Sequence, residues 1–224
     1  SCYIYKMKKF IYKMKKFKEL KKIHRKLRDN FDENFNIRIH RSLSWLEKSE
    51  LEKDADANFI FLWISFNGTY SNQTNKYDIV IRSEFFNLIY KYGKDEIDKI
   101  IDEKFKDEIY DILDNEHLMT SYWDGPGYEF ESTKEIEKEK AQNALSRSEK
   151  NSKITLEILF RRMSVLRNQI FHGYTTYNSK INKDSVKNAS ELMKKFIPLF
   201  IEIMMNNPSE AWGEIDFHPN GIYK

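Results

Sequence analysis

Apolar side chains recur along this chain with the spacing of one face of an α-helix, and this periodicity limits the possible folds more than any other feature. The clearest case ends near Gly173, and its apolar positions are Ile154, Ile158, Leu159, Met163 and Leu166. Steps of three, four and one residue place these side chains on one stripe with a period of about 3.6. No run alternates convincingly with a period of two, and 224 residues contain only 7 Gly and 4 Pro. We therefore predict an all-α bundle.

The same periodicity predicts several further helices. They cover residues 36–51, a segment ending at residue 70, and residues 79–92, 94–118, 132–150, 154–172 and 184–205. We expect Asp54 or Asp56 to cap the helix that ends at residue 70, and Asp184 to cap the last helix. Gly93 should end the helix over 79–92, and Pro198 should kink the last one.

Residues 132–150 differ from the other predicted helices because they are almost entirely polar. The turn signal WDGPG at 123–127 precedes them, and Ser132 with Glu135 has the spacing of a capping box. A helix that is polar on every side needs an outside reason to persist. We expect an exposed helical insertion or flap here, and an irregular tail from residue 208 onward.

The N-terminal segment is strongly basic. Residues 6–28 carry twelve Lys and Arg, with Glu19 as the only acid. Such an arm can neutralise phosphates, and Lys15, Lys16, Lys22 and Arg25 are its candidate RNA-binding residues. A solvated helix face or a frayed terminus is the alternative, and the exact heptad duplication over 4–17 supports no function by itself. We place a basic arm at 1–33 and one helical domain at 34–224.

Composition restricts the chemistry and the compartment. A single Cys2 excludes an internal disulfide and a cysteine-based zinc site. No stretch approaches the roughly 20 apolar residues of a membrane span, and the basic start lacks the apolar region of a secretion signal. We therefore expect a cytoplasmic protein. No His or carboxylate spacing suggests a metal site and no glycine-rich phosphate loop occurs, so no metal or cofactor is predicted.

Candidate chemistry concentrates in residues 166–174, which read LRNQIFHGY. Asn168 and His172 are four apart and share a helix face, whereas Arg167 and His172 are five apart, about 140° around the axis. These two side chains converge only if the last turn unwinds or a second copy of the chain completes the site. Imidazole titrates near neutral pH and guanidinium suits phosphoryl oxygens, so both residue types fit metal-free RNA cleavage.

A structural role is the alternative for this pair. Arg167 could pair with a carboxylate such as Glu157 or Asp184, and His172 could simply end a helix, where the macrodipole favours its cation.

The segment resembles the R-x4-6-H motif of the HEPN superfamily (higher eukaryote and prokaryote nucleotide-binding), with Asn168 directly after the arginine as in that family. Residues 59–70, FIFLWISFNGTY, look like the "apolar-W-x-x-F-N-x-x-Y" helix that precedes the catalytic helix in one bacterial HEPN group. Trp212-Gly213 with His218-Pro219 is similar to the tail of that group, and the order along the chain agrees. The resemblance extends from about Leu51 to the C-terminus.

The resemblance implies a HEPN-like bundle that works as a homodimer and cuts RNA without metal, as a toxin or an anti-phage effector. His172 would then transfer protons, Arg167 would position and stabilise the scissile phosphate, and Asn168 would orient one of them. The expected target is single-stranded or loop RNA, cut to a 2′,3′-cyclic phosphate. The alternatives are a non-catalytic RNA- or nucleotide-binding HEPN module and a structural partner in a multi-protein defence complex.

Two further residues have possible supporting roles. Asn67 lies among aromatic neighbours and could face the motif helix and help to fix His172, or it could satisfy backbone groups before Gly68. Tyr174 extends the pattern to R-x4-H-x-Y, which is similar to HEPN toxins whose nucleotidyltransferase antitoxin adds adenylate to that tyrosine. With 13 Tyr in the chain, Tyr174 could also stand there by chance.

Overall fold

The computed structural model describes residues 15–124, 129–146, 151–217 and 219, and every regular element among them is helical. This confirms the all-α prediction. In chain order the elements are α1 (Phe17–Leu27), η1 (Arg28–Asn30), α2 (Glu33–Leu51), α3 (Ala55–Tyr70), α4 (Asp78–Lys104), the π-helical turn η2 (Phe105–Ile109), α5 (Tyr110–Asp114), η3 (Glu116–Leu118), α6 (Thr120–Asp124), α7 (Glu129–Ser146), α8 (Ser152–Phe171) and α9 (Lys183–Asn206). In this part of the chain, no helix has the length and apolar character needed to cross a membrane. Most of the N-terminal heptad duplication lies outside the described residues.

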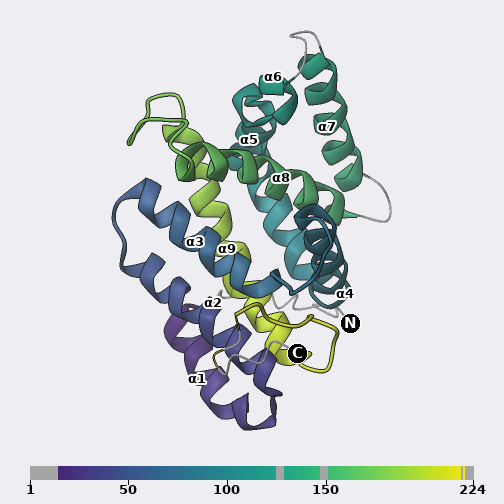
Figure 1. The fold of residues 1–224 in the computed structure, drawn as a ribbon. Coiled ribbons are helices and arrows are strands. Elements are labelled where there is room, and N and C mark those ends of the chain that lie inside the picture. Colours follow the sequence, from purple (N-terminus) through teal and green to yellow (C-terminus); the bar gives the residue numbers. More distant parts are fainter. Residues whose placement is uncertain (1–14, 125–128, 147–150, 218, 220–224) are drawn as a thin grey trace, which may run out of the picture.

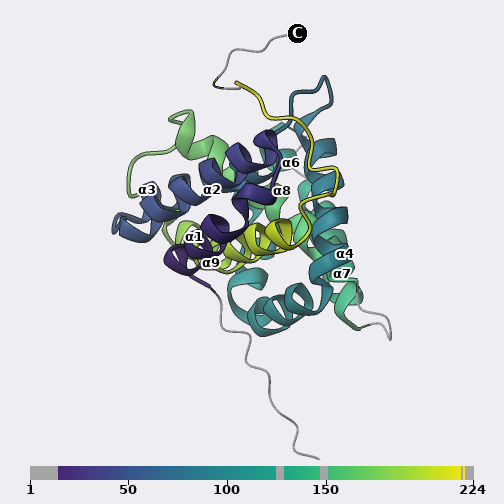
Figure 2. The same cartoon turned by 90° about the horizontal axis from the view of Figure 1, so that it is seen from below.

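Helix α9 runs through the middle of the bundle, with α1, α2 and α3 against one side of it and α4 and α5 against the other (Figures 1 and 2). Helix α8 crosses the upper half of Figure 1 and packs on α4 and α7. Four phenylalanines, one each from α3, α4, α8 and α9, meet at the centre with ring centroids 4.5–6.2 Å apart. They are Phe66, Phe86, Phe160 and Phe200. Aromatic contacts therefore join the helix that carries the motif to three others in one core.

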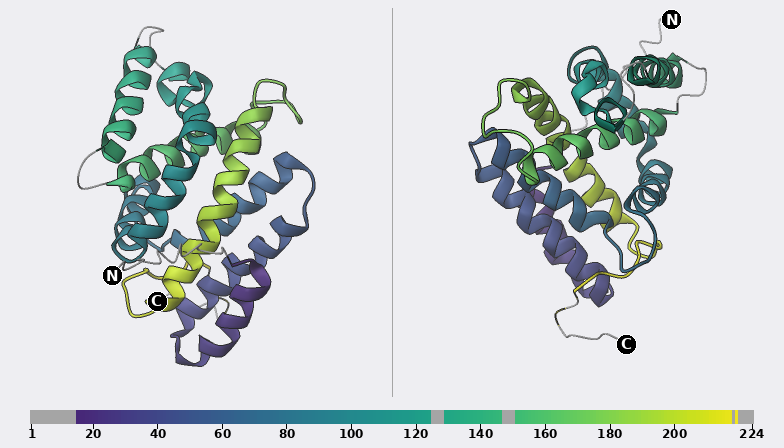
Figure 3. Two further views of the ribbon diagram at one scale, coloured as in Figure 1. Left: turned by 180° about the vertical axis from the view of Figure 1, so that it is seen from behind. Right: turned by 45° about the horizontal axis from the view of Figure 1, so that its top comes forward.

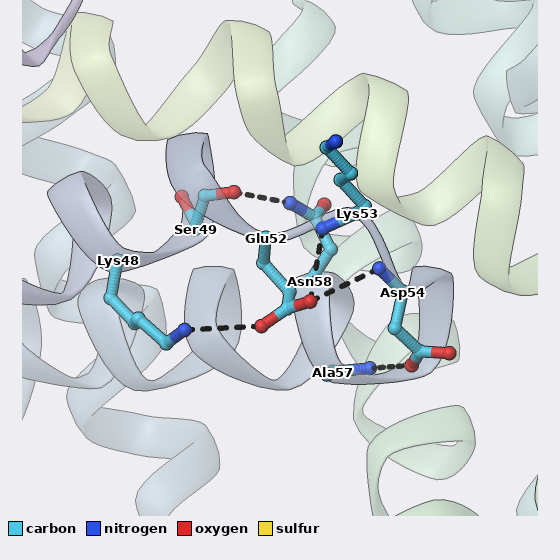
Figure 4. A network of polar contacts seen from close by, with 7 residues as sticks. All are labelled: Lys48, Ser49, Glu52, Lys53, Asp54, Ala57 and Asn58. Atoms are coloured by element: carbon cyan, nitrogen blue, oxygen red, sulfur yellow. Dashed lines mark hydrogen bonds and ion pairs between the residues drawn. The ribbon is translucent and has the colours of Figure 1, made fainter.

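The turn between α2 and α3 is held by local side-chain hydrogen bonds (Figure 4). The Asp54 carboxylate accepts from the backbone N–H of Ala57 at 2.9 Å, which confirms Asp54 as the cap of α3. Glu52 accepts from the backbone N–H of Asp54 at 3.1 Å, and the Asn58 amide donates to the Ser49 carbonyl at 2.6 Å. Sequence-local signals thus decide where α3 begins.

Gly93 interrupts the helix at the position where the sequence predicts an end, because two helical segments of α4 meet there. It kinks α4 with φ −128° and ψ 27°, and the helix continues to Lys104. A Cβ at Gly93 would lie 2.2 Å from Cδ1 of Ile203 on α9. Close packing of α4 against α9 is a second reason for a glycine at this position. The single helix predicted over 94–118 is wrong, because η2, α5 and η3 follow Lys104.

Helix α7 is part of the packed fold, and the prediction of an exposed flap is wrong. Ala141 and Ala144 are buried, and Glu137 pairs with Arg162 of α8, whose side chain is only 2% exposed. Ser132 lies inside the helix rather than at its start, so the predicted capping box does not form the N-terminus. The predicted turn at 123–127 lies partly outside the described residues.

The last helix is capped two residues earlier than predicted. Asn182, without a side-chain cap bond, is the N-cap of α9, and Asp184 lies in the first turn, where its charge still suits the helix dipole. Helix α9 is continuous through Pro198, which is buried.

The irregular tail after α9 is fixed to the surface of the bundle by two arginines of α2. Arg38, 1% exposed, donates to the Gly213 carbonyl at 3.1 Å and to Asn72 Oδ1 at 2.8 Å. Arg41 donates to the Asp216 carbonyl at 2.8 Å, and Trp212 is buried. Burial lowers the pKa of the Arg38 guanidinium to about 10. The tail is therefore an ordered part of the fold up to residue 217.

Candidate active site at the C-terminal end of α8

Helix α8 ends in a Schellman motif built around Gly173. The Gly173 N–H donates to the Ile170 carbonyl at 3.2 Å and the Tyr174 N–H to the Gln169 carbonyl at 2.8 Å. Gly173 has φ +70°, the left-handed conformation that a residue without Cβ adopts at little cost. This local signal places His172 at the C-cap, exposed at the end of the motif helix.

Arg167 points toward α3 instead of toward the end of its own helix. Its Cζ lies 5.3 Å from the ring centroid of Trp63, a cation–π contact, and its Nε is buried without a hydrogen-bond partner. No hydrogen bond or ion pair holds its terminal nitrogens among the described residues. Glu157, one of the suggested partners, instead accepts from Ser83 at 2.9 Å.

His172 has different neighbours. Its ring centroid lies 5.5 Å from that of Phe171 and 5.6 Å from that of Tyr174, and its side chain is exposed. Within the described chain, no hydrogen bond or ring contact joins Arg167 to His172. The two groups therefore have separate neighbours: Arg167 contacts Trp63, and His172 contacts Phe171 and Tyr174.

A polar network at the end of α3 lies close to Arg167. The Tyr70 hydroxyl is 3.1 Å from Asn67 Oδ1 and 2.8 Å from Asp78 Oδ1, so its single proton is shared between two acceptors. Burial, and next the Asp78 charge, raise the pKa of Tyr70, whereas the Arg167 charge lowers it. Asn67 is thus a hydrogen-bond acceptor for the Tyr70 hydroxyl, and no described contact joins Asn67 to His172.

The structure adds an arginine that sequence reasoning missed. Arg82 of α4 is only 8% exposed, and its Nε lies 3.3 Å from Asp78 Oδ2, while its Nη1 is buried without a partner. Arg82 and Arg161 line a pocket of about 210 Å³ between α4 and α8. The i,i+4 spacing of Asp78 and Arg82 was the only sequence signal for this pair, and it is common on helix surfaces.

Asn168 and Tyr174 lie on another groove, of about 400 Å³, between α6 and the end of α8. The Asn168 side chain is exposed and forms no hydrogen bond with Arg167 or His172 in the part of the chain that is described. Tyr174 is 77% exposed.

The four basic candidates of the N-terminal segment lie far from the motif. Lys15 pairs with Glu202 of α9, and Lys16 is exposed before the first turn of α1. Lys22 and Arg25 line a surface groove of about 400 Å³ on α1. Figures 1 and 3 place α1 at the opposite end of the bundle from the loop between α8 and α9. RNA that touched both places would have to follow the length of the molecule.

No group of three or more His, Cys, Asp or Glu side chains is arranged to hold a metal ion within the described ranges. Comparison of the chain with family models, with curated proteins and with solved structures finds no match. The site itself must therefore support any statement about function.

Proposed function

We propose that this protein is a metal-independent endoribonuclease of HEPN type, acting as a toxin or an anti-phage effector. The observation that carries the proposal is the state of Arg167. Its guanidinium is held over Trp63, its terminal nitrogens have no hydrogen-bond or ion-pair partner among the described residues, and it lies one and a half turns before an exposed His172. A partly desolvated, pre-positioned arginine near an accessible imidazole suits phosphodiester chemistry.

In the proposed reaction the 2′-oxygen of the RNA forms a bond to phosphorus while the bond from phosphorus to the 5′-oxygen breaks. His172 accepts the 2′-hydroxyl proton, and Arg167 stabilises the charge on the phosphoryl oxygens. The departing 5′-oxygen receives a proton from a second imidazole or from water. The products are a 2′,3′-cyclic phosphate and a 5′-hydroxyl. Asn168 would orient the substrate or one of these two side chains.

The proposed site is shared between two protomers, with Arg167 of one protomer and His172 of its partner at the same phosphate. The end of α8 and the loop after it support self-association there because they expose large apolar side chains. These are Phe171 at 65% and Tyr177 at 76% exposure. A surface of this kind is typical of an interface.

Cleavage of an end-labelled unstructured RNA by the purified wild type, Arg167→Ala and His172→Ala proteins tests the proposal. We expect both variants to lose cleavage and to relieve growth arrest on expression in bacteria, and we expect chelators to change nothing. His40→Ala is the matched control because His40 is an exposed histidine on α2. Equal cleavage or equal toxicity in all forms would remove the nuclease assignment, and activity lost with a chelator would reassign the mechanism to a metal.

A non-catalytic RNA-binding or partner-binding role is the second candidate. The separation of Arg167 from His172 within one chain favours it, as does the exposed apolar surface at the end of α8. RNA retention without cleavage, unchanged by His172→Ala, supports a binding module. Co-purification with another protein through that surface supports a structural partner in a defence complex.

We also propose that Tyr174 is a site at which an antitoxin of nucleotidyltransferase type could silence the protein. Its exposure makes the hydroxyl accessible, and its ring lies 5.6 Å from that of His172. An adenylate added there would place negative charge beside the imidazole. Mass spectrometry of the protein co-expressed with its genomic neighbour would show the added mass on Tyr174, and a Tyr174→Phe variant should remain toxic in that co-expression.

A further inference from the structure

The groove between α6 and the end of α8 has no acidic side chain and no Lys or Arg in its described lining. Among the described residues, its lining comprises His117, Thr120, Trp123, Val165, Asn168, Gln169, Tyr174, Thr175, Ile181 and Asn182. Its volume of about 400 Å³ lies within the range of about 300–1,000 Å³ for small-ligand sites. No Lys, Arg, Asp or Glu side chain lines it, so it suits a neutral group better than a phosphate.

Trp123 forms a rigid and exposed wall of this groove. Its indole N–H donates to the His117 carbonyl at 3.0 Å, and its ring lies edge to face with Tyr122 at 5.0 Å. The residue nevertheless remains 58% exposed. A large aromatic ring that is fixed at its polar edge but exposed to solvent is suited to stacking on a flat ligand.

The Gln169 and Asn182 amides at the base of the groove form hydrogen bonds within the protein, whereas His117 Nδ1 is buried without a partner among the described residues. The Gln169 amide donates to the His117 carbonyl at 2.7 Å, and its oxygen accepts from Asn182 at 3.2 Å. The His117 carbonyl also accepts from the Trp123 indole N–H, so the hydrogen bonds from Gln169 and Trp123 to this one carbonyl fix α6 against α8. The Asn168 amide has no such partner among the described residues, and it offers a donor and an acceptor to a ligand edge.

Tyr174 connects the groove to the proposed catalytic residue. Its ring lines the groove, and it also lies 5.6 Å from the His172 ring with an interplanar angle of 33°. A flat ligand stacked beside Tyr174 would therefore stand next to the imidazole.

We infer that this groove takes one unpaired nucleobase of the RNA, stacked on Trp123 and Tyr174, with its edge toward the Asn168 amide. Aromatic walls, the Asn168 amide and a lining without Lys, Arg, Asp or Glu match the chemistry of a base, and single-stranded RNA exposes such bases. The inference rests on the proposed function, because the groove then seats the nucleotide whose ribose meets His172. It makes the groove a determinant of which RNA segments are cut.

Binding of a 2′-O-methyl adenosine pentanucleotide with a 5′ fluorophore, followed by anisotropy, tests this inference without cleavage, because that RNA lacks the 2′-hydroxyl. We expect Trp123→Ala to weaken binding about 5- to 150-fold, which corresponds to about 1–3 kcal/mol for one stacked base. Trp123→Phe should keep most of the affinity. Trp45→Ala is the matched control, because Trp45 is a 38% exposed tryptophan that stacks on Phe61 on another face.

The outcomes separate this inference from the proposed function. Binding that depends on Trp123, by a protein that never cuts RNA, supports the groove and removes the nuclease. Cleavage with binding that is insensitive to Trp123→Ala, or reduced equally by Trp45→Ala, overturns the groove, as does the lack of any binding by the wild type. Loss of self-association in Trp123→Ala, measured by sedimentation, with unchanged RNA binding would assign the groove to a second copy of this chain.

Discussion

Glu137 of α7 should contribute more to stability than any other acid on that helix, although the sequence of α7 looks like that of an exposed helix. Its Oε2 accepts from Arg162 Nε at 3.0 Å and lies 2.7 Å from Arg162 Nη2. The Arg162 side chain is 2% exposed and burial lowers the pKa of its guanidinium, whereas Glu137 is 14% exposed. Glu137→Gln removes the only charge that compensates this buried cation in the described structure.

The size of the effect follows from this geometry. Removing one partner of a buried ion pair costs about 3–5 kcal/mol, because the other charge stays buried. We expect about 3 kcal/mol for Glu137→Gln, since the amide oxygen can still accept one hydrogen bond. Arg162→Met should cost less, about 1 kcal/mol, because it removes the buried charge itself and leaves Glu137 paired with the part-exposed Arg161.

Urea unfolding followed by circular dichroism measures these differences, with Glu139→Gln as the matched control because Glu139 is exposed on the same helix. The reasoning is refuted if Glu137→Gln loses no more stability than Glu139→Gln. It is also refuted if Arg162→Met proves more costly than Glu137→Gln.

Three further changes test the packing of the other half of the bundle. Arg38→Met removes four hydrogen bonds from a buried guanidinium and leaves acceptors at the end of α3 and in the tail without their donor, so we expect a loss of about 1–3 kcal/mol in urea unfolding and faster proteolysis after residue 206. Gly68→Ala would place a Cβ 2.6 Å from Ser42 Oγ; it should cost about 1–3 kcal/mol, and Ser42→Ala should restore part of this in the double variant. Burial lowers the pKa of His24, so the folded state resists its protonation; stability should fall as the pH drops below about 6.5, and His24→Gln should flatten that part of the profile.

Local signals in the sequence were sufficient to predict a helix end where a single turn determines it. Asp54 caps α3 through its own side chain, and Gly173 ends α8 through a left-handed residue, so both were predictable from neighbouring residues. Gly93 carries the same residue type but serves the approach of Ile203 from α9. The local pattern indicated the break at Gly93, but its packing role depends on a helix more than one hundred positions away and could not be predicted from neighbouring residues.

The polar composition of α7 led to the wrong prediction of an exposed flap for a related reason. Glu137 and Lys138 are charged side chains that normally face water, yet one pairs with Arg162 and the other with Asp114 at 2.7 Å. Helix α7 packs through small alanines and ion pairs instead of a broad apolar stripe, so hydrophobic periodicity could not show it. Prediction of the candidate site from the sequence has the same limitation. The residues 166–174 were visible in the sequence, but the contact of Arg167 with Trp63 required the fold.

The separation of Arg167 from His172 leads to a prediction about mixtures of inactive variants. Arg167 contacts Trp63 of α3 and His172 contacts Tyr174 after α8, so the proposed site would draw these two groups from two protomers. If Arg167→Ala and His172→Ala chains associate at random, half of the dimers contain one chain of each kind. Each such dimer has one intact site out of two, so the mixture should recover about one quarter of wild-type cleavage, while each variant alone stays inactive. Native mass spectrometry confirms that mixed dimers form. Mixed dimers that cut no more RNA than the separate variants would show that one chain supplies both groups, and the shared site would have to be abandoned.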